Sequence, residues 1–139
     1  MNVLIIYYST NGSTKKMSRL IARGVEKVDG IDALLRTVNS THNNGEEDDP
    51  IVTKQELQNC SALIIGSPTH FGNMATPMKA FIDTTTTEWH NGTLSGKPAG
   101  VFTSTSSLHG GQESTLITMM LPLLHHGMLI SGVPYTEKK

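Results

Sequence analysis

Three short polar stretches hold the residues best suited to bind a small ligand: positions 9–14, 67–74 and 104–112. The first reads Ser9-Thr10-Asn11-Gly12-Ser13-Thr14 and leads into a stretch with helical spacing. Hydroxyls and backbone N–H groups at a helix N-terminus stabilise a phosphate, because they meet the positive end of the helix dipole. An ordinary helix cap rich in Ser and Thr is the alternative. The stretch lacks the lysine of G-x-x-x-x-G-K-[ST] and the glycines of G-x-G-x-x-G, so we expect a terminal monophosphate rather than nucleotide hydrolysis.

The second and third stretches suit a flat heterocycle. Ser67 to Met74 offers backbone amides together with one histidine, one phenylalanine and one asparagine, which favours a binding loop over a plain connection. In the third stretch, His109-Gly110-Gly111-Gln112 supplies flexible backbone for a close approach to a ring.

Four other side chains have both a structural and a chemical interpretation. Trp89 lies in a polar stretch, so it is either an exposed stacking platform or a small packing residue. His125 and His126 can interact with a helix dipole, bind metal or face a ligand, but adjacent helical residues diverge too far to serve one metal easily. We expect no metal site, since no H-E-x-x-H pattern occurs. Cys60, the single cysteine, is interpreted as a small buried apolar residue.

Strands and helices alternate along the chain. Five strands are predicted, at Val3–Tyr8, Asp32–Val38, Ala62–Gly66, Ala99–Thr103 and Met128–Val133. The first and third are continuous apolar runs, which indicate strands buried on both faces. Helical spacing or capping signals predict helices after Thr14, after the capping box Thr53–Glu56, from Thr76-Pro77, and from about Glu113 to His125 with Gly127 as its carboxyl cap. This order predicts a parallel sheet with helices on both faces and ligands beyond the carboxyl ends of the strands. The acidic segment before Pro50 is expected to be an exposed loop.

Composition narrows the functional classes. The 139 residues suggest a single domain over 1–139, and 11 Lys+Arg against 12 Asp+Glu give a formal charge of -1, which favours neither nucleic acid nor membrane as the main partner. Without an 18-residue apolar run or a signal peptide, we expect a cytoplasmic protein. No helix follows the fifth strand, so either the sequence is a fragment or something else shields that face of the sheet.

Taken together, these segments resemble the flavodoxin-like fold and, within it, the WrbA family of NAD(P)H:quinone oxidoreductases. The motifs that carry the resemblance are Tyr7-Tyr8-Ser9 with Gly12, the segment Gly66 to Met74, Trp89, Gly110-Gly111-Gln112-Glu113, and His125-His126-Gly127-Met128. The resemblance implies a doubly wound α/β fold of three layers, with a five-stranded parallel sheet in the order 2-1-3-4-5 and without the family's last helix. The sequence departs from the family at Asn11, where tyrosine is common, and at His70, where arginine is frequent. It also has Leu108 and His109 in place of glycines.

The resemblance also implies the cofactor and the residues that would bind it. The cofactor is FMN, with NADH or NADPH as electron donor and a quinone as acceptor. Its phosphate would be bound by Ser9, Thr10, Asn11, Gly12, Ser13 and Thr14, and its ring by Pro68, Thr69, His70, Phe71, Gly72, Asn73, Ser104, Thr105, Ser106, Ser107, Leu108, His109 and Gly110. His125 would reach the flavin from a neighbouring helix or subunit, and Trp89 would form a wall of the substrate pocket. The resemblance also implies a homo-oligomer, a tetramer or dimer.

The implied reaction is a two-electron, ping-pong hydride transfer from the nicotinamide to the flavin and then to the quinone, with His70, His125 and Trp89 as the candidate catalytic residues. His70 and His125 could donate a hydrogen bond or a proton to the reduced quinone, or serve only as shape elements. A one-electron flavodoxin carrier is the first alternative, but such carriers use a large negative charge to reach cationic partners. A phospho-receiver module is the second, and it needs aspartates where the chain has Tyr8-Ser9-Thr10 and Gly66-Ser67-Pro68.

Overall fold

The computed structural model describes residues 1–40 and 49–136. Its elements, in chain order, are β1 (Asn2–Tyr7), α1 (Ser13–Val25), β2 (Asp32–Thr37), α2 (Lys54–Asn59), β3 (Ala62–His70), β4 (Asn73–Met74), α3 (Thr76–Asp83), α4 (Thr86–His90), β5 (Pro98–Ser104), α5 (Gln112–His125) and β6 (Leu129–Ile130). Most of the predicted acidic loop, residues 41–48, lies outside the described residues.

The strands form one twisted sheet in the order β2-β1-β3-β5-β6, and every neighbouring pair on this path is parallel. β4 is a short addition that pairs antiparallel with the end of β3. Without β4 the order is 2-1-3-4-5, which confirms the expected flavodoxin-like topology. Parallel pairing brings the carboxyl ends of β1, β3 and β5 to one edge of the sheet, and the three polar stretches begin there.

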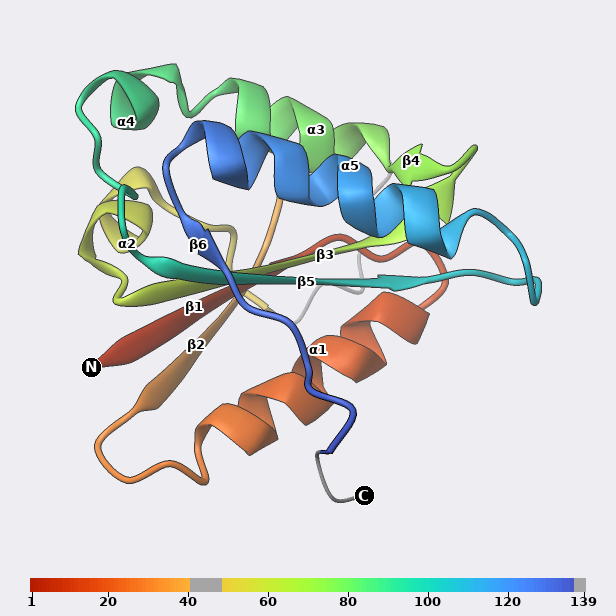
Figure 1. Cartoon of the computed structure of the whole chain (residues 1–139), viewed down its shortest axis with the longest axis horizontal. Coiled ribbons are helices and arrows are strands. Elements are labelled where there is room, and N and C mark those ends of the chain that lie inside the picture. Colours follow the sequence, from red (N-terminus) through yellow and green to blue (C-terminus); the bar gives the residue numbers. More distant parts are fainter. Residues whose placement is uncertain (41–48, 137–139) are drawn as a thin grey trace.

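Helices cover the two faces of the sheet unequally. α3 and α5 lie on one face, whereas α1 lies on the other (Figure 1). The alternation of strand side chains explains both contacts: Leu4 and Ile6 point into the core shared with α3 and α5, and Ile5 and Tyr7 point toward α1. All four are almost completely buried.

Beside α1, the sheet carries an apolar groove over β3 and β5. The groove has a volume of about 440 Å³, and its lining includes Ile21, Ile64, Pro98, Gly100 and Val133. Figure 1 shows the chain after β6 passing along this face, and the described residues contain no second helix there.

Three local predictions were wrong. β3 extends through Ser67 and Pro68 to His70, because these residues pair with β5 and β4, so the second polar stretch is a hairpin rather than a loop. α4 was missed because its five residues, Thr86 to His90, show no apolar periodicity. The last strand has two residues instead of the six expected between Met128 and Val133.

The other signals were accurate. The capping box at Thr53 is formed, since its hydroxyl accepts from the Glu56 N–H and the Glu56 carboxylate accepts from the Thr53 N–H. Cys60 is buried, and its thiol donates to the Leu57 carbonyl. None of the helices in the described residues is long and apolar enough to cross a bilayer.

Candidate functional site

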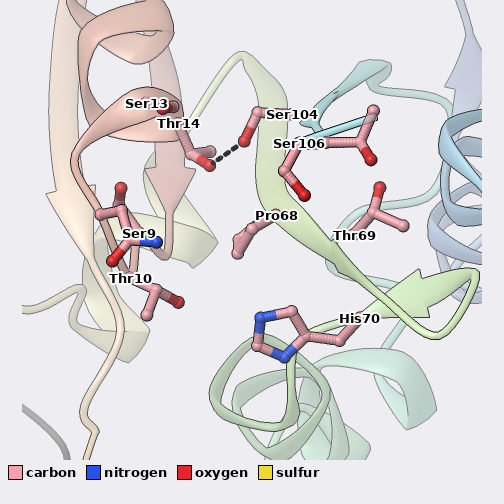
Figure 2. A pocket seen from close by; sticks show the side chains of 11 residues that line it. Ser9, Thr10, Ser13, Thr14, Pro68, Thr69, His70, Ser104 and Ser106 are labelled. Carbon is pink, nitrogen blue, oxygen red and sulfur yellow. Dashed lines mark hydrogen bonds between the residues drawn. The ribbon is translucent and has the colours of Figure 1, made fainter. Parts of the chain in front are cut away.

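A cavity of about 230 Å³ opens where β1, β3 and β5 end. Figure 2 shows side chains from all three polar stretches pointing toward it. Its lining consists of Ser9, Thr10, Asn11, Ser13, Thr14, Pro68, Thr69, His70, Ser104, Thr105 and Ser106. Every one of these residues belongs to the set predicted to bind the cofactor. The sheet therefore brings together residues that are separated by up to about a hundred positions in the sequence.

The first polar stretch leaves the N-terminus of α1 without a side-chain cap. Gly12 occupies the N-cap position with a φ of 83°, and no side chain bonds to the first turn there. The hydroxyl of Ser9 instead accepts from the Gly12 N–H at 3.0 Å, which folds the loop back on itself. The Ser- and Thr-rich cap considered as an alternative is therefore not formed, and the helix presents its N-terminal amides toward the cavity.

Hydroxyl–hydroxyl bonds connect the three stretches. Thr14 Oγ1 lies 2.9 Å from Ser104 Oγ, across two loops that are 90 positions apart. Thr103 donates to the Ser67 carbonyl at 2.7 Å, so its hydroxyl oxygen accepts from Thr69 at 3.1 Å. These bonds hold the strand ends in register and place neutral donors around the cavity.

The charge around the cavity favours an anion. No Asp, Glu, Lys or Arg belongs to the eleven lining residues, and His70 is the only titratable group among them. Just beyond the lining, Lys15 and Lys16 stand in the first turn of α1, where the helix dipole disfavours cations. An anion bound at this helix end would offset that repulsion. Among the lining residues that the structure describes there is no carboxylate, and the ends of β1 and β3 carry none of the aspartates that the phospho-receiver alternative requires.

The rest of the second stretch forms the tip of the β3–β4 hairpin. Phe71 adopts a φ of 53° and is fully exposed, and it does not line the cavity. The Gly72 carbonyl accepts from the Ser114 hydroxyl of α5 at 2.9 Å. A Cβ on Gly111 would stand 2.9 Å from the Gly72 Cα. Packing against the hairpin therefore requires a glycine at position 111.

The remaining predicted ring contacts also lie outside the lining. They are Gly72, Asn73, Ser107, Leu108, His109 and Gly110, and Gly12 of the predicted phosphate site lies outside the lining too. In the third stretch, Gln112 closes the loop on itself, since its side chain accepts from the Gly110 N–H and donates to the Leu108 carbonyl.

Trp89 and His125 lie together, but at the other end of α5. The Trp89 indole N–H donates to the His125 carbonyl at 3.0 Å, and both residues line a second cavity of about 320 Å³ between α3, α4 and α5. α5 has 14 residues and spans about 21 Å, so this cavity is remote from the first one within a single chain. The structure therefore does not bring Trp89 and His125 to the strand ends of their own subunit.

His126 is buried beneath this second cavity. Its Nε2 lies 2.8 Å from the Thr85 hydroxyl, which already donates to the Ile82 carbonyl, so the imidazole donates and its Nδ1 is an acceptor. Nδ1 has no hydrogen-bond partner among the described residues. Burial lowers the pKa of His126, although the charge of Glu88 acts in the opposite direction. His126 is thus a neutral packing residue rather than an exposed cap.

Comparison with known proteins decides which family has this arrangement. A family model described as NADPH-dependent FMN reductase matches residues 1–135. The chain belongs to this family. It is 43% identical over 149 aligned positions to a protein named NAD(P)H dehydrogenase (quinone) from Solidesulfovibrio magneticus, with 98% of this chain and 73% of that protein covered. A protein of the same name from Geobacter sulfurreducens is 45% identical over 148 positions, with 97% and 73% covered.

A solved structure supports the same assignment. The crystal structure of a flavodoxin, WrbA-like protein from Agrobacterium tumefaciens superposes on this FMN reductase family member with a TM-score of 0.76 and 27% identity. The superposition covers 92% of this chain and 74% of that protein. The resemblance inferred from the sequence motifs is therefore confirmed at the level of family and fold.

The cavity at the strand ends fits the phosphate of FMN on its own geometry. It combines an uncapped helix N-terminus with side-chain hydroxyls from Ser9, Thr14 and Ser104, and none of the described lining residues is acidic. Ser67 and Thr103 hold this arrangement in place; the sequence named Ser67 only as the start of the second stretch and Thr103 only as the end of a strand. Their hydroxyls act within the strands, and only the pairing of β3 with β5 reveals that role.

Proposed function

We propose that this member of the FMN reductase family is an FMN-dependent NAD(P)H:quinone oxidoreductase, which reduces quinones to hydroquinones by two-electron transfer. The observation that carries this proposal is the neutral, uncapped helix N-terminus at the edge of a flavodoxin-like sheet. The curated relatives named NAD(P)H dehydrogenase (quinone) support the choice of donor and acceptor. The chain's charge of -1 gives no support to a one-electron carrier that finds its partners by charge.

The chain's own residues bind and orient the reactants. Residues 9–14 would hold the phosphate of FMN, and residues 68–73 and 104–110 would flank its ring. When bound, FMN supplies the hydride-accepting and electron-donating chemistry, so no nucleophile or carboxylate pair is needed from the protein. His70 lines the cavity and is the residue placed to give a hydrogen bond or a proton to the quinone.

A homo-oligomer would complete the site with Trp89 and His125. The exposed side of α5 carries three apolar residues, Ile117, Leu121 and Leu124, each more than half exposed. If two subunits meet along this stripe with the two-fold axis perpendicular to α5, their α5 helices run antiparallel. The Trp89 and His125 end of one subunit then lies beside the strand ends of the other. In this arrangement Trp89 walls the quinone site, and His125 contacts the ring from the partner.

The preferred nicotinamide and the cellular location belong to the same proposal. We propose use of NADH or NADPH in the cytoplasm, where reduced nicotinamides are produced. Asn11, which stands where the family commonly has tyrosine, lines the cavity. This residue would therefore affect the binding of the nicotinamide.

The function is tested by reconstitution and turnover. The purified chain should bind one FMN, and the holoprotein should reduce benzoquinone with NADH or NADPH faster than free FMN does. Thr14→Val removes one donor from the phosphate site and should weaken FMN binding by roughly 10- to 100-fold, since a hydrogen bond to a charged group contributes about 1.5–3 kcal/mol. Thr87→Val on exposed α4 is the control and should bind FMN like the wild type. A chain that stays colourless in excess FMN, or a holoprotein without quinone turnover, would contradict the proposal.

A further inference from the structure

The cavity at the strand ends contains one side chain that can change its charge near neutrality. His70 ends β3, and its backbone pairs with Asn73 of β4. Figure 2 shows its imidazole beside Pro68, turned toward the space that Thr10 also faces. The imidazole is exposed, and it has no hydrogen bond or ion pair with any described residue. No described residue therefore holds the imidazole in one protonation state.

None of the other ten lining residues can provide a positive charge to neutralise a negative charge on a bound group. They contribute hydroxyls, an amide and a proline, which stabilise an anion as dipoles but keep the same charge at every pH near neutrality. If a bound group gains negative charge during the reaction, His70 is the lining residue that can respond by binding a proton.

Within residues 1–40 and 49–136, the charged groups on the surrounding elements do not take over this role. On α3, Lys79 is paired with Asp83 at 2.6 Å, and both lie outside the lining. On α5 and the connection before it, Glu113 and His109 are exposed and also lie outside. On α1, Lys15 and Lys16 belong to the first helical turn, next to the phosphate end of the cavity. Their charges are constant near neutrality, so they shift the local potential without adding a pH dependence.

We propose that His70 takes up one proton from water when the bound cofactor is reduced, and returns it when the quinone is reduced. This inference rests on the proposed function. The nicotinamide loses a hydride, which carries two electrons and one proton, and the cofactor gains one negative charge. The imidazole becomes a cation at the same stage. The quinone then receives the hydride equivalent from the cofactor and the second proton from His70, which yields a neutral hydroquinone and restores the neutral imidazole.

The consequence is a reduction potential that depends on pH through His70. The experiment measures the potential of the FMN-loaded protein by spectroelectrochemical titration at several values between about pH 5 and pH 8, the range in which imidazoles titrate. The slope counts the protons bound per two electrons. We expect His70→Gln to bind fewer protons than the wild type, by up to one per two electrons, within this range. His70→Arg should show the smaller slope as well, but at a more positive potential, because its charge is permanent.

Two further measurements make the outcome decisive. His90→Gln, which removes an exposed histidine on α4, should keep the wild-type slope. In the wild-type holoprotein, the imidazole resonances of His70 should shift to the protonated position at a higher pH after reduction. Equal slopes in wild type and His70→Gln, or an imidazole that titrates identically in both redox states, would overturn the inference. A chain that does not bind FMN would instead contradict the proposed function, so the two failures are distinguishable.

Discussion

Phe102 of β5 lies across Gly66 of β3 on the α1 face of the sheet, just before both strands reach the site. A Cβ on Gly66 would overlap with the Phe102 ring. Phe102 is buried together with Ile5 and Tyr7, so moving its ring disturbs packing against the core. The residues that follow, Ser67 and Thr103, hold the strand ends together by a hydrogen bond. Packing thus requires a glycine at position 66, and this position directly precedes the strand ends that form the ligand cavity.

We predict that Gly66→Ala lowers the free energy of unfolding by about 1–3 kcal/mol, the usual effect of overpacking a core. Gly100→Ala is the matched control on the same face, since its Cβ would meet only Ile64 Cγ1, at 3.9 Å. It should be neutral or stabilising by up to about 1 kcal/mol, because alanine restricts the unfolded chain. Urea unfolding measures both. Equal effects of the two substitutions would show that the Phe102 contact is not a constraint.

At the scale of elements, the junction of α4 and α5 depends on a few polar contacts. Thr85, just before α4, accepts from His126 at the end of α5, and Trp89 of α4 donates to the His125 carbonyl. Glu88 is almost completely buried, and Lys54 of α2 forms an ion pair with it at 3.3 Å. Burial alone would raise the pKa of Glu88, but hydrogen bonds from its own backbone and from Lys54 outweigh burial and lower it. A short helix without apolar periodicity is thereby fixed in place.

We predict that this junction makes the stability of the protein sensitive to mild acid. Burial lowers the pKa of His126 from its ordinary 6.5, so the unfolded chain binds a proton more readily than the folded one. The free energy of unfolding should therefore fall as the pH decreases from about 6.5 toward the lowered value, and it should not fall further below that value on account of this group. Unfolding in urea between about pH 8 and pH 5 measures this decline.

His126→Gln should reduce the decline, because glutamine does not titrate. His125→Gln is the matched control, since His125 is exposed and adjacent. The carboxylates act in a separate range: the hydrogen bond from Arg36 lowers the pKa of Glu56 below its ordinary 4.5, so its contribution is lost only at more acidic pH. A decline that persists unchanged in His126→Gln would place its origin elsewhere.

At the scale of the whole molecule, the apolar stripe on α5 is the feature that an isolated subunit does not account for. Ile117, Leu121 and Leu124 are spaced by four and three residues, so they share one side of the helix. Their exposed fractions are 58%, 54% and 54%, whereas α5 buries Thr115, Met119 and Leu123 on its opposite side. Adjacent exposed apolar residues of this kind are typical of subunit contacts.

We predict that the holoprotein is oligomeric and that Leu121→Lys shifts it toward monomers, since the substitution places a charge in the centre of the proposed contact. Leu20→Lys on α1 is the matched control, because Leu20 is 63% exposed and lies on the other face of the sheet. Sedimentation velocity distinguishes the species. A wild-type protein that is monomeric at micromolar concentration, or an equal effect of both substitutions, would contradict this prediction.

The sequence by itself determined the fold and the composition of the site to a large extent. Uninterrupted apolar runs such as Leu4 to Tyr7 indicate strands covered on both faces, and the helix-length segments between them leave a parallel sheet as the consistent arrangement. In a parallel sheet the carboxyl ends of neighbouring strands meet at one edge, so polar residues after three strands must converge. This rule places the three polar stretches around the cavity.

Only the tertiary structure decided which of the predicted residues meet. It showed that Gly12 leaves α1 uncapped, that the second stretch is a hairpin with Phe71 at its exposed tip, and that Trp89 and His125 lie at the far end of α5. The place of Trp89 and His125 depends on a contact between segments that are distant in the sequence, and local patterns carry no information about such contacts. A helix of 14 residues separates two sets of side chains by its length, and whether they meet again depends on how a second subunit packs.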